Sequence, residues 1–196
     1  MDLKASKVLL ILLVLISCSK EDENGYRVYT INKGNHYSDG PIDKLFGNDN
    51  RADSWEWEVI FEPSCIYLES DLFNPSNYLD VNKLIGFSDC DRHHSQYSCR
   101  VGWRASGDSI ELLIYKRDDN NIGFKSLKKV YPDQIVNVTL DFKDTIYTSC
   151  IDGICDTLIR PCPDWSGRKY SLFPFFGGQE TAPHKMKIRI KWINIT

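Results

Sequence analysis

The sequence predicts an all-β protein, an antiparallel two-sheet sandwich of about ten to twelve strands. Three observations support this fold class. Apolar and polar residues alternate with a period of two in several segments, turn signals separate these segments, and no helical stripe exceeds two turns. A strand that covers a core with one face buries every second side chain, so this alternation indicates strands that share one core. Neither an internal repeat nor a second domain is evident.

The alternation is clearest in SWEWEVIF, where two tryptophans alternate with two glutamates. Strands are predicted at 54–61, 109–115, 134–142 and 185–193. Turn signals occur in SDGP at 38–41, ASGD at 105–108, DDNN at 118–121 and FGGQ at 176–179. The only helix expected is a short one at 43–46.

Residues 98–115 read as two strands joined by a Ser-Gly-Asp turn, and their alternation assigns each side chain to a face. The predicted core face carries Val101, Trp103, Ala105, Ile110, Leu112 and Ile114. The opposite face then carries Arg100, Gly102, Arg104, Glu111, Leu113 and Tyr115. Two parallel arginines on an exposed face can hold a carboxylate or sugar hydroxyls. The alternative is that they pair with Glu111 across the strands.

Just before this hairpin, residues 89–96 are predicted to form a surface loop that brings His93 or His94 to the edge of the same face. The ligand-binding candidates are therefore His93, His94, Arg100, Arg104, Glu111 and Tyr115. Histidine or tyrosine beside arginine also suits a polysaccharide lyase, which needs a base and a positive group. Asp89 and Asp91 lie near the histidines, but with no second ligand set we predict neither a metal nor a cofactor.

Two glutamates are candidates for the paired catalytic acids of a glycosidase. Glu56 and Glu58 share a face of the predicted strand 54–61, where paired carboxylates can cleave a glycosidic bond. Glutamates on the solvent face of a strand are the commoner explanation. For His36 and His184, each beside a turn, loop packing is the expected role.

The chain begins like an exported protein. A short basic segment precedes the nine-residue apolar run VLLILLVLI, which is too short to span a bilayer as a helix. The run ends in LISC, which resembles the lipobox of bacterial lipoproteins and implies that Cys18 carries lipid. An ordinary secretion signal with a free Cys18 is the alternative. We therefore expect a signal peptide at 1–17, the lipidated cysteine with an acidic tether at 18–25, and one β-sandwich domain at 26–196.

The net charge argues against nucleic-acid binding, and the cysteine content agrees with export from the cytoplasm. Removing 17 residues with a net charge of +1 changes the formal net charge from −3 to −4, and no long basic run predicts nucleic-acid binding. Beyond Cys18, the remaining cysteines are Cys65, Cys90, Cys99, Cys150, Cys155 and Cys162. An even set in an exported chain suggests disulfides, whereas zinc would need a CxxC-like spacing that is missing.

One disulfide follows from local geometry. A hairpin around Asp152-Gly153 places Cys150 opposite Cys155 in a non-hydrogen-bonded pair, which is close enough for a bridge. If Cys90 closes the histidine-containing loop onto Cys99, then Cys65 remains for Cys162.

The motifs NKLIGFSD, HH, SCRVGWR and FGGQETAPH together resemble a group of Bacteroidota lipoproteins of unknown function. The resemblance covers about residues 26–193 and implies a concanavalin-like jelly roll. The acidic KEDE after Cys18 is similar to the export signal of their surface lipoproteins, which implies an outer-membrane or cell-surface location with membrane contact through the lipid alone. We therefore expect a lectin-like domain that binds a glycan or another extracellular ligand. The alternatives are a polysaccharide lyase or glycoside hydrolase, and a structural or adhesive envelope protein.

Overall fold

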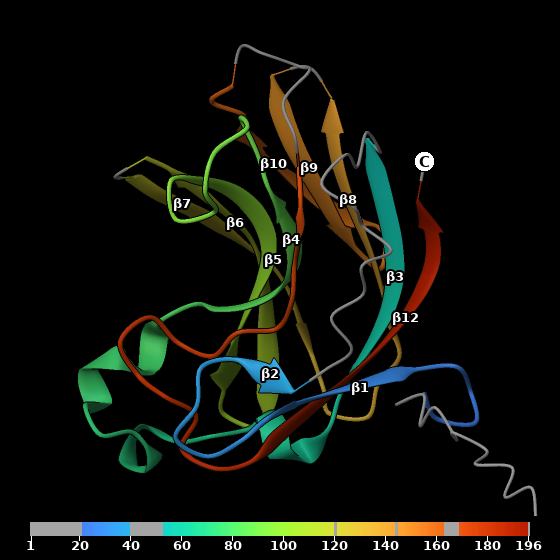
Figure 1. The fold of residues 1–196 in the computed structure, drawn as a ribbon. Coiled ribbons are helices and arrows are strands. Elements are labelled where there is room, and N and C mark those ends of the chain that lie inside the picture. Colours follow the sequence, from blue (N-terminus) through green and yellow to red (C-terminus); the bar gives the residue numbers. More distant parts are fainter. Residues whose placement is uncertain (1–20, 40–52, 120, 144, 163–168, 196) are drawn as a thin grey trace, which may run out of the picture.

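The computed structural model describes residues 21–39, 53–119, 121–143, 145–162 and 169–195. The described chain is all-β, and two antiparallel sheets pack face to face around one core (Figure 1). This confirms the predicted sandwich. Three short 3-10 helices are the only helical elements of the described residues, and none of them has the length and apolar character needed to cross a membrane.

The larger sheet has seven strands in the order β10-β9-β8-β3-β12-β1-β2. Their bounds are β1 (Arg27–Ile31), β2 (Ser38–Asp39), β3 (Ser54–Phe61), β8 (Val136–Lys143), β9 (Ile146–Ile151), β10 (Ile154–Ile159) and β12 (Met186–Ile195). The smaller sheet has five strands in the order β11-β4-β5-β6-β7. Their bounds are β4 (Asn82–Ser88), β5 (Tyr97–Ser106), β6 (Ser109–Asp118), β7 (Asn121–Val130) and β11 (Ser171–Leu172).

The predicted strands all appear in the structure. β3 has the predicted bounds, and β6, β8 and β12 contain most of the other three predicted segments. The 3-10 helices η1 (Pro63–Cys65), η2 (Glu69–Asp71) and η3 (Pro75–Leu79) were not expected. The helix predicted at 43–46 and the lipidation site Cys18 lie outside the described residues. Within the predicted tether, Asp22 accepts hydrogen bonds from the backbone amides of Asn24 and Tyr26 and so forms a turn.

Burial of the predicted core face explains why the 98–115 hairpin adopts this register. Trp103 is fully buried between the sheets, where its ring lies 5.4 Å from that of Phe61. Directly opposite pairs on β5 and β6 include Arg100 with Tyr115 and Arg104 with Glu111. The predicted assignment is therefore confirmed, because all members of the predicted core face lie in the core between the sheets: Val101, Trp103, Ala105, Ile110, Leu112 and Ile114.

The structure contains two disulfides, and one of them differs from the prediction. Cys150 and Cys155 are bridged across the hairpin with their Cα atoms 4.0 Å apart, as expected. Cys90 is bonded to Cys162, whereas Cys99 and Cys65 are free and buried. The predicted Cys90–Cys99 and Cys65–Cys162 pairs are therefore wrong. The alternation on β5 gives the reason: Arg100 faces outward, so Cys99 points into the core and away from the loop that carries Cys90.

Candidate functional site

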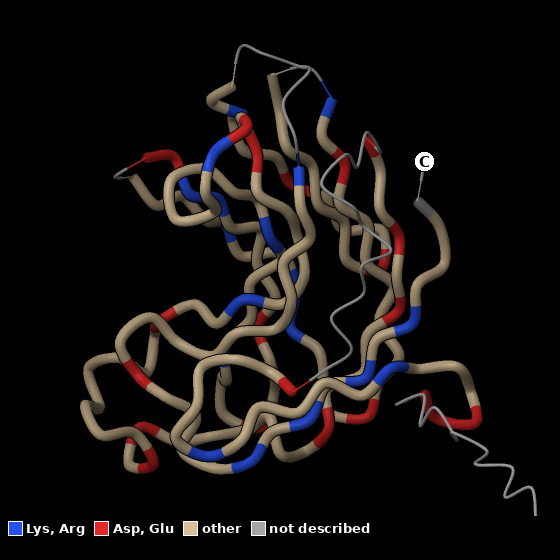
Figure 2. Tube along the Cα trace, viewed as in Figure 1, with Lys and Arg blue, Asp and Glu red and all other residues tan. Residues whose placement is uncertain are grey.

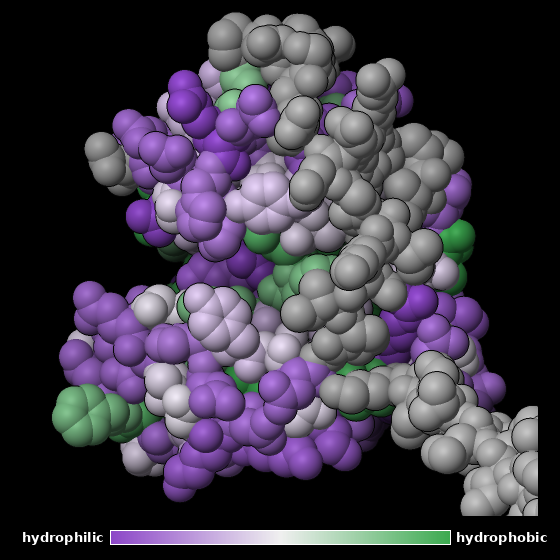
Figure 3. Space-filling view, in the orientation of Figure 1, coloured by the Kyte–Doolittle hydropathy of each residue, from purple (hydrophilic) through white to green (hydrophobic). Residues whose placement is uncertain are grey.

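A cleft of about 200 Å³ lies on the face of the five-stranded sheet that is turned away from the core, here called the open face. Figure 3 shows the molecule hollowed in the region of β5, with strongly hydrophilic residues in the hollow. The cleft is lined by Lys83, His94, Ser95, Ser98, Arg100, Tyr115, Arg117, Phe175, Gly177 and Gly178.

Strand alternation places the floor of the cleft. On β5 and β6, Ser98 lies opposite Arg117 and Arg100 opposite Tyr115, so all four side chains share the open face. Lys83 comes from β4, and Phe175 reaches the cleft because its backbone forms an isolated bridge with Lys83. The site thus combines three cations with two aromatic rings.

Arg100 is buried rather than exposed, which corrects the prediction that it lies on a solvated surface. Its side chain is 7% exposed and donates to the carbonyl oxygens of Leu84, at 3.3 Å, and Phe173. Gly86 makes room for it, because a Cβ there would lie 2.8 Å from the Arg100 Cγ and 2.1 Å from the carbonyl oxygen of Cys99. Burial lowers the pKa of Arg100 below its usual range, although an arginine still carries its charge at neutral pH.

Lys83 adds a second cation at the glycine-rich side of the cleft. Its Nζ donates to the Gly177 carbonyl oxygen at 2.9 Å and lies 5.4 Å from the Tyr115 ring centroid. Burial and the charges of Arg100 and Arg117 together lower the pKa of Lys83 to about 8, although the charge of Asp80 raises it.

Lys83, Arg100 and Arg117 are called the cation cluster below. Among the described residues, no carboxylate forms an ion pair with any of them. Figure 2 shows Lys and Arg positions close together on the five-stranded sheet. Three positive charges that share a cleft repel one another, so an anion entering the cleft would relieve this repulsion.

His94 is the member of the histidine pair that reaches the cleft. Its Nδ1 lies 2.8 Å from the Tyr170 hydroxyl, which also accepts a hydrogen bond from the His94 backbone amide at 2.9 Å. Burial lowers the pKa of His94, and so do the charges of His93, Arg100 and Arg117, so the ring is neutral at pH 7. His93 is exposed, contacts Ser95 Oγ and does not line the cleft.

Arg104 and Glu111 lie on the open face, as predicted, but bind each other. Arg104 Nε lies 2.6 Å from Glu111 Oε2, and Arg104 also donates to the carbonyl oxygen of Leu79 at 2.9 Å. Glu111 accepts a further hydrogen bond from Ser126 Oγ. For these two residues the structure matches the alternative of cross-strand pairing, and neither lines the cleft.

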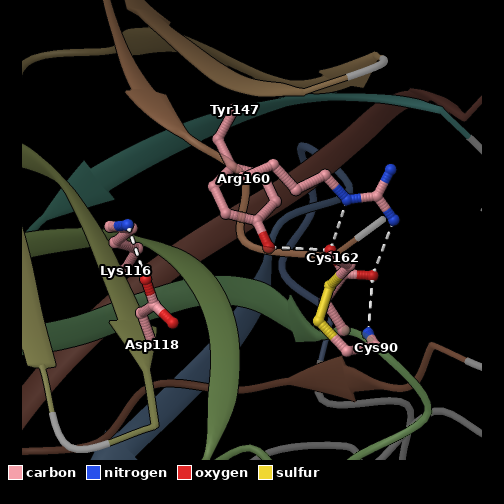
Figure 4. The surroundings of a disulfide bond; sticks show 7 residues. Cys90, Lys116, Asp118, Tyr147, Arg160 and Cys162 are labelled. Carbon is pink, nitrogen blue, oxygen red and sulfur yellow. Dashed lines mark hydrogen bonds and ion pairs between the residues drawn. A yellow bond between two sulfur atoms is a disulfide. The ribbon is translucent and has the colours of Figure 1, made fainter. Parts of the chain in front are cut away.

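The loop at 89–96, here the histidine loop, is fixed at its base by a buried ion pair. Asp89 accepts hydrogen bonds from Arg160 and from the Tyr147 hydroxyl, next to the Cys90–Cys162 disulfide (Figure 4). Asp89 also lies close to both sulfurs of that disulfide. Because these sulfurs are bonded to each other and the carboxylate is paired with Arg160, we interpret the three residues as a structural link rather than a metal site.

The remaining candidates lie away from the cleft. Glu56 and Glu58 project from β3 on the outer side of the seven-stranded sheet, with Trp55 and Trp57 buried on its inner side, and Glu58 accepts a hydrogen bond from the Tyr26 hydroxyl at 2.5 Å. A broader depression of about 540 Å³ lies over β1, but its charged lining is mainly acidic. His36 and His184 contact the carbonyl oxygens of Phe176 and Ser64, as expected of loop-packing histidines.

Sequence reasoning missed Lys83, Arg117 and Phe175 as cleft residues. Arg117 extends the alternation Glu111, Leu113, Tyr115 by one step, so the pattern already placed it on the open face. Lys83 and Phe175 meet through a backbone bridge between segments far apart in the chain, which local periodicity does not reveal.

No protein-family model matches the sequence, and no curated protein matches it either. Solved structures with a similar fold include the PL7 alginate lyase AlyA1 from Zobellia galactanivorans, with 12% identity and a TM-score of 0.57 over 89% of this chain and 78% of that chain. The glucanase SCLam, a non-specific endo-β-1,3(4)-glucanase from family GH16, gives 12% identity and a TM-score of 0.56 over 88% of this chain and 72% of that one.

The alginate lyase PA1167 from Pseudomonas aeruginosa is 12% identical with a TM-score of 0.49 over 76% of this chain, which spans 65% of that lyase. The matches to AlyA1 and SCLam establish the jelly-roll sandwich fold.

Proposed function

We propose that the cleft binds an acidic polysaccharide through the carboxylate of a uronate unit. The observation that carries this proposal is the cation cluster, whose three side chains form no ion pair with a carboxylate among the described residues, although the charge of Asp80 raises the pKa of Lys83. A uronate supplies the missing negative charge, and its ring can lie against Tyr115 and Phe175. The fold supports a polysaccharide ligand in general, since AlyA1 is an alginate lyase and SCLam a glucanase, whereas the acidic character of the ligand rests on the cation cluster.

A second candidate is β-elimination on the same ligand, because His94 and Tyr115 lie in the same cleft as Arg100. A lyase must remove the proton beside the uronate carboxylate, stabilise the charge that develops, and protonate the glycosidic oxygen as its bond to the uronate breaks. His94 is neutral at pH 7 and so can accept the first proton, while burial raises the pKa of Tyr115 and keeps its hydroxyl protonated, so that it can donate a proton to the leaving oxygen. Arg100 is the cation that would stabilise the developing charge.

The cellular setting is part of the proposal. The LISC motif supports lipid attachment at Cys18, and KEDE supports export to the outer surface of a Bacteroidota cell. The cleft would then meet polysaccharides outside the cell. Cys18→Ser should release the protein from the membrane fraction, and a variant that stays bound after a carbonate wash would contradict the lipid anchor.

Binding is tested by titrating the soluble domain with polyuronates and with a neutral β-glucan. We expect saturable binding of a polyuronate and none of the neutral chain. Arg117→Gln should weaken binding about tenfold or more, because it removes a charge-assisted contact. Lys125→Gln is the matched control, because Lys125 is exposed on β7 and pairs with Asp156 outside the cleft.

The same samples distinguish binding from catalysis. Growth of unsaturated-uronate absorbance that is lost in His94→Gln would establish the lyase, whereas binding without such absorbance would leave the lectin-like function. Equal binding by Arg117→Gln and the unaltered protein would contradict the proposed site.

A further inference from the structure

Exposed aromatic rings lie on both sides of the cation cluster. On one side, Phe175 lines the cleft and the Tyr37 ring meets it edge-on, with centroids 5.0 Å apart. On the other side lies Phe124 of β7, directly opposite Tyr115. Tyr37 is 73% exposed and Phe124 47%.

Backbone pairing places these rings in one diagonal row across the strands, because Lys83 lies opposite Gly102 of β5, two residues from Arg100. Phe175 bridges to Lys83 on β4, Arg100 of β5 lies opposite Tyr115 of β6, and Tyr115 lies opposite Phe124 of β7. The Phe124 ring is on the open face, because the Arg104 guanidinium lies 6.0 Å from its centroid and Arg104 belongs to that face. The order across the sheet is therefore aromatic, cationic, aromatic.

The rings at the first end are held in position. His36 stacks on Phe175 with centroids 5.1 Å apart, and its Nδ1 lies 2.9 Å from the Phe176 carbonyl oxygen. This contact fixes the segment that carries Tyr37 against the segment that carries Phe175. A ring that is already fixed loses little conformational entropy when a ligand stacks on it.

The length of the row indicates the size of the ligand. Neighbouring strands are about 4.8 Å apart, so the three steps from β4 to β7 span about 14 Å, and the bridge to Phe175 adds about 5 Å more. One sugar unit cannot cover this distance, whereas several linked units can.

We infer that the cleft binds an internal stretch of several sugar units lying across the strands, with a uronate at the cation cluster and flanking rings stacked on Tyr37 with Phe175 and on Phe124. This inference rests on the proposed function and adds the length and direction of the ligand. The C–H groups on the face of a pyranose ring form an apolar surface that suits an aromatic side chain, and an aromatic contact is worth about 0.5–1.5 kcal/mol, or roughly twofold to tenfold in affinity.

The test is a length series of acidic oligosaccharides, from the disaccharide to the hexasaccharide, titrated against the unaltered protein, Tyr37→Ala and Phe124→Ala. We expect affinity to rise with length in the unaltered protein. Each variant should weaken hexasaccharide binding by roughly threefold to tenfold and leave disaccharide binding within about twofold. Phe73→Ala is the matched control, because Phe73 is 99% exposed and lies outside the row.

The outcomes separate the two proposals. If the unaltered protein binds no acidic oligosaccharide, the proposed function fails and this inference fails with it. If it binds the acidic series but Tyr37→Ala and Phe124→Ala bind the hexasaccharide as tightly as the unaltered protein, the inference alone is refuted. It is also refuted if Phe73→Ala weakens binding as much as Phe124→Ala.

Discussion

Asp89 and Arg160 form a two-point ion pair, with Arg160 Nε 2.6 Å from Oδ2 and Arg160 Nη2 2.8 Å from Oδ1. Asp89 follows β4 of the five-stranded sheet, whereas Arg160 follows β10 of the seven-stranded sheet. The two side chains are 0% and 2% exposed, and the Tyr147 hydroxyl donates to the same carboxylate at 2.7 Å. The pair therefore joins the two layers at the base of the histidine loop.

Removing one partner of this pair should destabilise the fold strongly. Arg160→Met leaves a buried carboxylate without its counter-charge, and we expect a loss of about 3–5 kcal/mol in the free energy of unfolding measured by urea titration. Lys125→Met is the control, because the exposed Lys125–Asp156 pair should contribute less than about 1 kcal/mol. Equal losses in the two variants would contradict the structural role of Asp89.

The two faces of β5 should respond differently to truncation. Trp103→Ala removes a fully buried ring and should cost about 3–5 kcal/mol in stability. Arg100→Ala should cost about 1–3 kcal/mol, because it leaves the carbonyl oxygens of Leu84 and Phe173 without their donor. Thermal or urea unfolding of both variants measures the difference, and a tolerated Trp103→Ala would mean that the faces are reversed.

Lys83 should make ligand binding depend on pH. Its pKa of about 8 means that the amine loses its charge as the pH rises from about 7 to about 9, so affinity for a polyuronate should fall by up to about tenfold. His94 and Tyr115 stay neutral over this range. Lys83→Met should bind more weakly and show a flat pH profile, whereas a slope that survives this substitution would assign the titration to another group.

Lys83 should also make the stability of the fold depend on pH, in the direction opposite to that of ligand affinity. The folded-state pKa lies below the ordinary value of 10.5, so the unfolded chain binds more protons between about pH 8 and about 10.5. The free energy of unfolding of the unaltered protein should therefore increase, relative to that of Lys83→Met, as the pH rises through this window. Urea titrations at several pH values measure this difference, and a difference that does not change with pH would contradict the lowered pKa.

The cysteines should differ in their reactivity. Burial raises the pKa of the Cys65 and Cys99 thiols, so neither should react with iodoacetamide in the folded protein. Both should be labelled after unfolding without reductant, and peptide mapping should recover Cys90 linked to Cys162 and Cys150 linked to Cys155. Rapid labelling of Cys99 in the folded protein would place it outside the core.

Strong local patterns predicted most of the fold. SWEWEVIF places Trp55 and Trp57 on one face with no competing arrangement, and β3 has the bounds expected of it. The edge strand β7 was not singled out, because most of its side chains are exposed on both faces and the alternation is lost. The 3-10 helices at 63–79 likewise contain too few residues to show a period.

The candidate site was predictable only where it follows one hairpin. Arg100 and Tyr115 share a face because of their spacing, and this relationship can be seen in the sequence. The disulfide between Cys90 and Cys162 and the bridge between Lys83 and Phe175 join segments that come together only when the sheets pack. The burial of Arg100 depends on the same packing, since the carbonyl oxygens it binds belong to Leu84 and Phe173.

The double attachment of the histidine loop, through the Asp89–Arg160 pair and the adjacent Cys90–Cys162 bond, makes the rim of the cleft part of the rigid body of the sandwich. His94 therefore does not have to be brought into place by the ligand. A site of this kind is complementary to one ligand shape before the encounter, and under the proposed function selection among polysaccharides would depend on the fit of each chain to a fixed template.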